Sequence, residues 1–308
     1  MAAIVAQALS YRYGRTLALD ALDLTVPEGS MYALLGPNGS GKTTLMQILA
    51  GMRRASHGSA HVLGRDVRHL SVADRQRIAY VAEGQRLPAW MRLDEWEAYL
   101  APLYPTWDHA LAQSLRDRFD LDPKRKLGAL SRGTAMKAAL LGALAPRPQL
   151  LFMDEPFTGM DVIVKDELVR GLLDSAGQEG WTVLLCSHDI AEVELVVDWM
   201  GLLRDGRMTM SESMESLQSR FKRVEIVDAG VSVDRLPRGA MQVERSGART
   251  RFLVSDADET LEARLRAQLP SDARVEVFDV SLREVFVAMS TAPRSGMESA
   301  GSFVRVPA

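Results

Sequence analysis

The chain has 308 residues, of which 47% are hydrophobic and 25% charged, and its formal net charge is −3. This length suits one large domain plus a smaller one, and the apolar fraction is high enough to build a core. The slightly acidic balance does not indicate a nucleic-acid binder, and the apolar runs are too short to cross a bilayer. The N-terminus lacks the order of a signal peptide, and the single cysteine, Cys186, rules out an internal disulfide, so we expect a reducing, cytoplasmic setting.

The first distinctive segment is a glycine-rich loop at residues 36–43, Gly-Pro-Asn-Gly-Ser-Gly-Lys-Thr. It follows 31–35, which predicts a buried strand, and precedes 44–50, which predicts a helix. Strand, loop and helix form the context of a phosphate-binding loop, whose backbone N–H groups wrap the phosphates. Lys42 is expected to reach the β- and γ-phosphates, and the Thr43 hydroxyl to hold Mg²⁺. The residues assigned to nucleotide binding here are Gly36, Pro37, Asn38, Gly39, Ser40, Gly41, Lys42, Thr43 and Thr44.

Residues 1–70 read mostly as strands around this loop, including a short strand at 58–64. A further strand is expected at 78–82. From about 88 to 146 the chain reads as helical, because large apolar side chains recur at helical spacing and prolines separate the helices. The side chains concerned are Trp90, Leu93, Trp96, Tyr99, Leu100, Leu111, Leu115 and Phe119.

Two carboxylates follow the next buried strand, 150–153. At the carboxyl end of a strand, Asp154 is expected to hold Mg²⁺ through water, and Glu155 to polarise the attacking water. Without the phosphate loop elsewhere in the chain, an ordinary acidic turn would explain this pair equally well. Segment 162–179 then reads as a helix and 181–186 as another buried strand. Helices alternating with all-apolar strands predict an α/β fold with a parallel sheet covered on both faces.

The pattern of elements changes in the last third of the chain. An amphipathic helix is expected at 257–268, and Ser281 with Glu284 forms a capping box that opens a last helix. The end of the chain, 291–308, is rich in Ser, Gly, Ala and Pro and is expected to be a mobile tail. The strands expected around these helices are 224–227, 241–244, 251–255 and 275–278.

Over about residues 3–210 the chain resembles the ATP-binding subunits of ABC transporters, because seven motifs occur in that family's order. They are Tyr13 for the adenine-stacking aromatic, 36–43 for the Walker A loop, Glu83 for the Q-loop, 130–134 for the signature, 153–155 for Walker B, 159–161 for the D-loop and 187–189 for the H-loop. The resemblance implies a P-loop NTPase domain at 1–210, with an N-terminal β-subdomain, a mostly parallel sheet with flanking helices, and a helical subdomain inserted at about 84–146. Residues 211–290 then form a small α+β accessory domain.

The resemblance also implies roles for individual side chains. Tyr13 stacks on adenine, and His188 stabilises the transferring charge. Ser131 and Gly133 bind the γ-phosphate held by the opposite subunit. Ordinary roles stay open beside these: Tyr13 as a strand aromatic, Ser131 as a helix N-cap and His188 as a structural histidine. The implied catalytic set is Glu155, His188 and Lys42, and the further nucleotide contacts are Glu83, also a metal contact, and Asp161.

The chain departs from the family's common pattern at the Q-loop, the signature and the D-loop. Glu83 replaces glutamine, Arg132 and Thr134 replace glycine and glutamine, and Met160 replaces leucine. None of these changes removes a catalytic group, so we expect an active site. The Leu-Ser-Arg-Gly signature, the acidic Q-loop and the C-terminal unit are similar to the type-2 ABC exporter group.

The resemblance therefore implies an ATP-hydrolysing subunit of an ABC exporter, with ATP and Mg²⁺ as its cofactors. One chain carries one phosphate loop and one signature, so each site needs a second ATPase subunit, for which an identical copy is favoured. A separate integral membrane permease completes the transporter, so the chain is expected at the inner face of the cell membrane. Aromatic side chains of the helical segment are expected to line the groove that grips it, the candidates being Trp90, Trp96, Tyr99 and Trp107.

Three other functions stay open. A soluble ABC ATPase acting on ribosomes or DNA conflicts with the single ATPase unit and the lack of a basic stretch. An importer subunit fits the signature and the C-terminal unit less well. A regulatory module without turnover conflicts with Glu155 and His188, and a basal ATPase assay would decide this case.

Overall fold

The computed structural model describes residues 1–82, 84–158, 160, 165, 180–188, 190, 194, 197–227, 236–237, 240–258, 260–269 and 273–291. The chain divides into two compact units, Met1–Met210 and Ser211–Ala308. Within the described ranges, every helix is too short or too polar to span a bilayer. The helix expected at 162–179 and the tail expected at 291–308 lie outside the described residues, except at Lys165 and Thr291.

The first sheet of unit 1 is antiparallel and has the strand order β2-β1-β4-β5. Its strands are β1 (Ala2–Tyr13), β2 (Thr16–Pro27), β4 (His57–Val62) and β5 (Arg65–Asp66). Buried side chains of this sheet join one apolar core with those of α1 (Lys42–Leu49), the helix that follows the phosphate loop. The same core includes residues of the second sheet, so α1 is held from both sides.

The second sheet has the order β10-β9-β3-β8-β7-β6, and its neighbours from β9 to β6 are parallel. Every residue of β3, β7 and β8 is buried, which confirms the expectation of a parallel sheet covered on both faces. The bounds of its strands are β3 (Met31–Leu35), β6 (Ile78–Ala82), β7 (Leu150–Asp154), β8 (Thr182–Ser187), β9 (Trp199–Arg204) and β10 (Arg207–Ser213).

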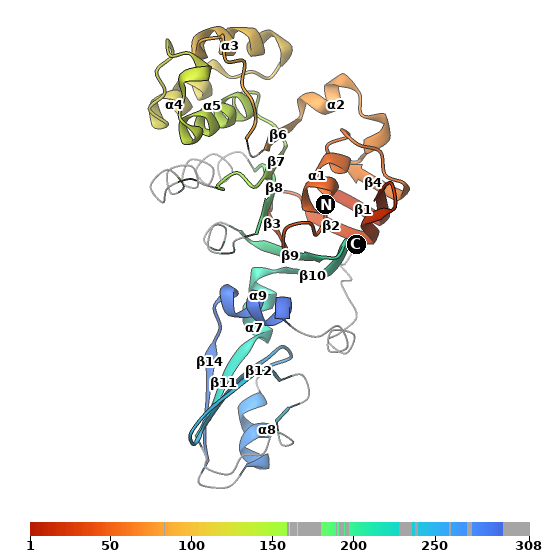
Figure 1. Ribbon diagram of the computed structural model, residues 1–308, viewed down its shortest axis with the longest axis vertical. Helices are drawn as coiled ribbons and strands as arrows, with labels where there is room; N and C mark the ends of the chain where they lie inside the picture. Colours follow the sequence, from red (N-terminus) through yellow and green to blue (C-terminus); the bar gives the residue numbers. More distant parts are fainter. Residues whose placement is uncertain are drawn as a thin grey trace. The chain divides into compact units, whose positions relative to one another are not determined.

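A helical group follows β6 in the chain and precedes β7 (Figure 1). Trp96 of α3 is buried, and its ring packs against Gly142 of α5, where a Cβ would clash with it. Trp90 and Tyr99 are 75% and 57% exposed, so a core role does not account for them. The helices are α3 (Leu93–Leu100), α4 (His109–Arg118) and α5 (Arg132–Leu144), and the short α2 (Val72–Gln76) lies before β6.

Unit 2 is built on an antiparallel sheet of order β12-β13-β11-β14. One face of this sheet forms an apolar core with Leu261 and Leu265 of α8. The predicted capping box is present, because Ser281 Oγ accepts the Glu284 N–H at 3.3 Å and the Glu284 carboxylate accepts the Ser281 N–H at 3.0 Å. The bounds are α7 (Met214–Arg220), β11 (Lys222–Val227), β12 (Met241–Ser246), β13 (Arg249–Val254), α8 (Leu261–Gln268), β14 (Arg274–Asp279) and α9 (Leu282–Thr291).

Candidate functional site

The site forms at the carboxyl edge of the second sheet. In the parallel register, Leu35 at the end of β3 pairs with Ser187 at the end of β8, and Asp154 at the end of β7 pairs with Cys186. The phosphate loop follows β3, Glu155 follows β7 and His188 follows β8. Three chemical groups from distant parts of the sequence therefore meet at one edge, as ligand sites of open α/β sheets do.

The phosphate loop needs glycine where backbone approaches it closely. Gly41 has a φ of 108°, and a Cβ there would lie 2.6 Å from the carbonyl oxygen of Ala18. Gly36 is packed against the backbone of Leu203, and a Cβ would overlap its carbonyl oxygen. Within the described residues, Ser40 Oγ is buried without a hydrogen-bond partner, which a phosphate oxygen at this loop would supply.

Lys42 is buried, and its ammonium lies over the loop. Its Nζ donates to the carbonyl oxygens of Gly36 at 2.7 Å and Pro37 at 3.3 Å, and it lies 3.4 Å from Oε1 of Glu155. These contacts place one positive charge between the loop and the carboxylate that follows β7. A phosphate group at the loop can exchange the carbonyl contacts for charge-assisted ones.

Both carboxylate oxygens of Asp154 accept hydrogen bonds. Thr43 Oγ1 donates to Oδ1 and Tyr80 Oη donates to Oδ2, each at 3.1 Å. Burial raises the pKa of Asp154, while these two donors pull it down. The structure thus brings together Thr43 and Asp154, the two described residues expected to hold Mg²⁺. Tyr80 is a site residue that the sequence analysis missed, because only the pairing of β6 with β7 brings it beside Asp154.

Glu155 adopts a left-handed conformation, with a φ of 50°, which is strained for a residue with a side chain. Its own N–H donates to the Cys186 carbonyl at 3.1 Å, which fixes this conformation to β8. Its Oε2 lies 2.7 Å from Nδ1 of His188, and Thr158 Oγ1 donates to the same oxygen at 3.4 Å. An ionised carboxylate only accepts, so His188 can bond to such a group only by donating from Nδ1, which leaves Nε2 for another group.

Tyr13 ends β1, about 30 residues before α1 in the chain, but it contacts the first turn of that helix. Its hydroxyl is 3.3 Å from Oγ1 of Thr44, and 46% of the residue is exposed. An exposed aromatic ring beside a phosphate loop can stack on a flat base. The position of Tyr13 suits the base of a nucleotide, and its stacking role stays a prediction beside that of an ordinary strand aromatic.

Ser131 caps α5. Its Oγ accepts the Thr134 N–H at 3.2 Å and lies 2.7 Å from the Thr134 hydroxyl, so the ordinary N-cap role accounts for its described bonds. Ser131 is exposed, and Gly133 lies in the first turn behind it. Among the described residues, neither one has a hydrogen bond to the phosphate loop of its own chain.

Two residues that the sequence assigned to the site, Glu83 and Asp161, lie outside the described residues. The same is true of Gly159 and Asp189, which belong to two of the motifs.

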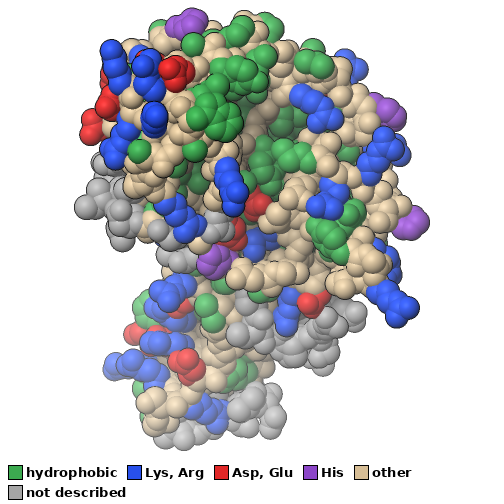
Figure 2. Space-filling model, turned by 45° about the horizontal axis from the view of Figure 1, so that its top comes forward, with side chains coloured by type: hydrophobic (Ala, Val, Ile, Leu, Met, Phe, Trp, Pro, Cys, Tyr) green, Lys and Arg blue, Asp and Glu red, His purple; other side chains and the backbone are tan. Residues whose placement is uncertain are grey.

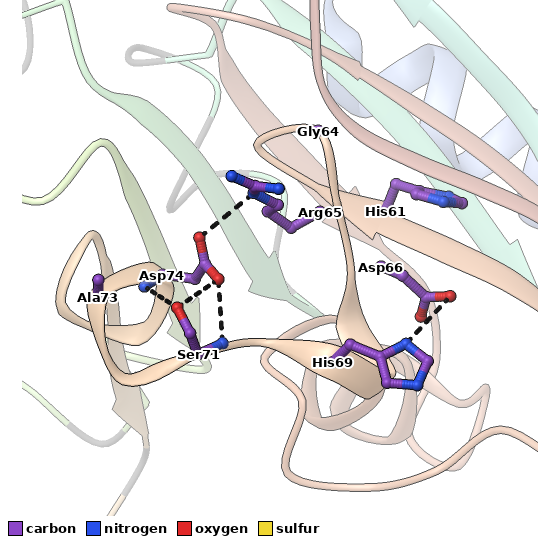
Figure 3. A pocket seen from close by; sticks show the side chains of 8 residues that line it. All are labelled: His61, Gly64, Arg65, Asp66, His69, Ser71, Ala73 and Asp74. Atoms are coloured by element: carbon purple, nitrogen blue, oxygen red, sulfur yellow. Dashed lines mark hydrogen bonds and ion pairs between the residues drawn. The ribbon is translucent and has the colours of Figure 1, made fainter.

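A separate hollow of about 580 Å³ lies on the first sheet and is lined by none of the predicted site residues (Figure 3). Each of its two acidic side chains lies beside a basic one. Arg65 lies 3.6 Å from Asp74, which caps α2 with Ser71, and His69 lies 3.9 Å from Asp66. No group of three or more metal-binding side chains occurs among the residues that the structure describes. Asp66 and Asp74 are therefore satisfied by their neighbours, Asp66 chiefly by Arg68.

Comparisons with known proteins agree with this geometry. The family model described as ABC transporter matches residues 19–158. The chain is 31% identical to the daunorubicin resistance ATP-binding protein DrrA3 of Streptomyces coeruleorubidus, over 97% of this chain and 99% of that protein. It is 25% identical to the ABC transporter ATP-binding protein YtrB of Bacillus subtilis, over 88% of this chain and 92% of that protein.

Solved structures show the same fold. An ATP-binding subunit of an ABC transporter superposes with a TM-score of 0.64 at 24% identity, over 70% of this chain and 91% of that one. The cassette MJ0796, solved as a dimer in a post-hydrolysis state with ADP and Pi, gives 0.61 at 21% identity, over 68% of this chain and 98% of that one. The α/β P-loop fold is thereby confirmed. With a full-length relative at 31% identity, the chain belongs to the ATP-binding proteins of ABC transporters, and it is an ATPase that couples ATP hydrolysis to transport.

Proposed function

We propose that this chain drives export by a separate membrane permease, with Glu155 as the general base of ATP hydrolysis. One observation carries the assignment of the base: the Glu155 carboxylate lies between Lys42 at 3.4 Å and His188 at 2.7 Å, at the edge where the phosphate loop begins. A base so placed can orient a water for in-line attack on the γ-phosphate and accept its proton.

Lys42 and His188 have different tasks in this proposal. Lys42 leaves the carbonyls of Gly36 and Pro37 for the β- and γ-phosphates, and its charge stabilises the transferring group. His188 holds the Glu155 carboxylate through Nδ1 and presents Nε2 to the γ-phosphate. The Ser40 hydroxyl, buried and without a described partner, gives its hydrogen bond to a phosphate oxygen.

Mg²⁺ is the proposed metal, with Thr43 and Asp154 as its protein contacts and Glu83 as a further candidate. Mg²⁺ prefers oxygen ligands and commonly takes one or two from protein and the rest from water and substrate phosphates. The adjacent hydroxyl and carboxylate of Thr43 and Asp154 fit this preference. When bound, Mg²⁺ supplies positive charge that neutralises the phosphates during transfer.

A second copy of the chain is proposed to complete each site. Ser131, which is exposed, and Gly133, which is half-buried, have no described bond to their own phosphate loop, so they are available to a γ-phosphate held by another subunit. Two ATP molecules then join two chains around a two-fold axis, and Asp161 stays a further candidate for contact with the nucleotide. Hydrolysis removes these contacts and lets the pair open, which moves the permease.

We infer the direction of transport by comparing how much of the chain aligns with drug-resistance relatives and how much aligns with import relatives. Two daunorubicin resistance proteins, DrrA3 and DrrA2, match 97% and 91% of the chain, so their similarity extends into unit 2. Two sulfate and thiosulfate import proteins match 77% and 65% of it. Unit 2 is therefore shared with proteins that confer drug resistance, and we propose export, at the cytoplasmic face of the membrane, with unit 2 supporting the dimer.

The test is a pull-down with the Glu155→Gln variant and ATP–Mg²⁺ from native membranes, with Glu28→Gln as the matched control because Glu28 is exposed and remote from the motifs. Glu155→Gln should bind ATP, lose turnover by at least about a hundredfold and trap a dimer that retains a polytopic membrane protein. Wild-type turnover in Glu155→Gln would reject the base. Recovery with ribosomes or DNA proteins, and no membrane partner, would reject transport. A second, different ATPase chain would reject the homodimer.

A further inference from the structure

Arg53, which follows the helix of the phosphate loop, is enclosed by two tyrosines of β1. The carbon of its guanidinium lies 5.2 Å from the ring centre of Tyr11 and 5.0 Å from that of Tyr13. The two rings meet edge to face, with centres 4.9 Å apart and planes at 76°. Arg53 Nη1 also donates to the Tyr11 hydroxyl at 2.8 Å. One cation therefore contacts both rings, and a hydrogen bond fixes its orientation.

The backbone around Arg53 is fixed as well. Its N–H donates to the carbonyl of Gln47 at 3.1 Å, and its Nε donates to the Gln47 side chain at 3.0 Å. Ser56 anchors the same segment to β1, because its N–H donates to the Ser10 carbonyl at 2.8 Å and its Oγ accepts the Arg12 N–H at 3.3 Å. The guanidinium is thus held by the last turns of α1 on one side and by β1 on the other.

Tyr13 is consequently held at both ends of its side chain. Its hydroxyl contacts Thr44 in the first turn of α1, and its ring contacts Arg53 beyond the end of the same helix. Even so, 46% of Tyr13 is exposed, so part of its surface is free for a flat ligand. The neighbouring Arg54 is exposed and has no described hydrogen bond or ring contact, which makes it a matched control for Arg53.

We propose that Arg53 and Tyr11 are positioning residues for the nucleotide: they hold the Tyr13 ring in one orientation, so that a purine base stacks on a prepared platform. The proposal rests on the proposed role of Tyr13. An exposed aromatic ring that could rotate would lose side-chain entropy when a base binds, and this loss weakens binding. A ring already fixed by a cation and a second ring has lost that entropy before the base arrives.

The ordinary alternative is that Arg53 only ties α1 to β1. The two possibilities differ in what they do to binding of the base relative to binding of the phosphates. If Arg53 only links α1 to β1, its loss should weaken the binding of any phosphate ligand, because α1 begins within the phosphate loop. If Arg53 positions the Tyr13 ring, its loss should weaken the binding only of a ligand that carries a base.

The experiment uses the full chain and two probes, ATP and inorganic tripolyphosphate, with binding measured at equilibrium and thermal stability recorded for each variant. Arg53→Ala should weaken ATP binding by about tenfold and leave tripolyphosphate binding unchanged. Arg53→Lys should recover part of the loss, Tyr11→Phe should cause a smaller loss, and Arg54→Ala should cause none. Equal loss for both probes, or no loss for ATP, in Arg53→Ala would overturn the proposal.

Tyr13→Ala separates this proposal from the one on which it rests. In that background, Arg53→Ala should cause no further loss of ATP affinity, because Arg53 acts through the ring that has been removed. If Tyr13→Ala itself leaves ATP affinity unchanged, the base does not stack there and the role proposed for Tyr13 fails. If Tyr13→Ala weakens ATP binding and Arg53→Ala does not, the inference about Arg53 alone is rejected.

Discussion

The hydroxyl of Tyr80 donates a hydrogen bond to Oδ2 of Asp154 over 3.1 Å, while Thr43 occupies the other carboxylate oxygen at the same distance. Burial raises the pKa of the Tyr80 hydroxyl, with the Asp154 charge acting in the same direction, so this proton stays on the tyrosine and orients the carboxylate. The side chain of Asp154 is therefore fixed from β6 as well as from α1. Since Asp154 is the proposed contact of Mg²⁺, we expect its hydrogen-bond partners to affect how tightly the metal binds.

Tyr80→Phe tests this relationship. Removing the hydroxyl frees one oxygen of Asp154, so we expect about a tenfold higher Mg²⁺ concentration for half-maximal ATPase activity. Phosphate release measured against Mg²⁺ at fixed ATP gives the value. Tyr99→Phe, at an exposed tyrosine of the helical group, should leave the Mg²⁺ requirement unchanged. An unchanged requirement in Tyr80→Phe would show that Thr43 and the strand alone orient Asp154.

His188→Ala should lower turnover by about a hundredfold with a small effect on ATP binding, since in the proposed mechanism the histidine orients Glu155 and stabilises the transferring group. Because the two side chains act as a unit, Glu155→Gln combined with His188→Ala should be no slower than Glu155→Gln alone. Single-turnover phosphate release measures all three. His61→Ala, at an exposed histidine of β4, is the control. If the loss of turnover in the double variant equals the product of the two single losses, the two residues act separately.

Gly41→Ala should prevent the phosphate loop from forming. Its φ of 108° disfavours any side chain, and the new Cβ would meet the Ala18 carbonyl oxygen at 2.6 Å. Gly64→Ala provides the comparison, because Gly64 also has a positive φ, of 76°, but open space around it. We expect Gly64→Ala to cost about 1–2 kcal/mol of stability and keep ATP binding, and Gly41→Ala to lose ATP binding. Thermal melts and equilibrium binding compare them, and ATP binding by Gly41→Ala would refute the close approach.

We expect the Asp108 carboxylate to make a pH-dependent contribution to the stability of the folded chain. Its carboxylate accepts the Leu111 N–H and pairs with Arg147, each at 2.9 Å, and these bonds, the backbone one first, lower its pKa below the ordinary 3.8. The folded chain thus binds fewer protons than the unfolded chain between the two pKa values, so the contribution is present above pH 3.8 and is lost as the pH falls through the folded value.

Asp108→Asn keeps the cap of α4 and removes the charge. We expect it to lower Tm by about 2–4 °C at neutral pH, with the difference from the wild type shrinking at roughly pH 3. Melts of both chains over this range measure it. Asp256→Asn, at an exposed aspartate, should show no such trend. A pH-independent difference would mean that the charge of Asp108 has no part in the contribution.

The sequence could predict the main site because its parts follow strands. The phosphate loop, Asp154 with Glu155, and His188 each come directly after an apolar strand, and parallel strands end at one edge. Tyr80 could not be predicted in this way. It reads as one more residue of a strand, and only the pairing of Tyr80 with Phe152 brings its hydroxyl to the neighbouring carboxylate.

Local side-chain bonds account for one helix boundary that the sequence did not predict. The helix expected at 257–268 begins at Leu261, because Asp258 accepts the N–H and the hydroxyl of Thr260, and such local bonds compete with those of a helix. Arg53 was invisible to the sequence analysis for another reason. In the sequence Arg53 is one of two adjacent arginines after a helix, which indicates no particular role. Only the folded structure, in which β1 pairs with β4, shows the rings of Tyr11 and Tyr13 beside it.

The central position of β3 has a consequence for biosynthesis. Both of its neighbours, β8 and β9, begin after residue 180, whereas β3 itself ends at Leu35. A ribosome delivers the chain from its N-terminus, so the apolar β3 must wait, unpaired, until most of unit 1 has been made. Non-local pairing of this kind slows folding and leaves an aggregation-prone strand exposed. We therefore expect the emerging chain to acquire nucleotide-binding ability in a single late step, and to depend on chaperones until then.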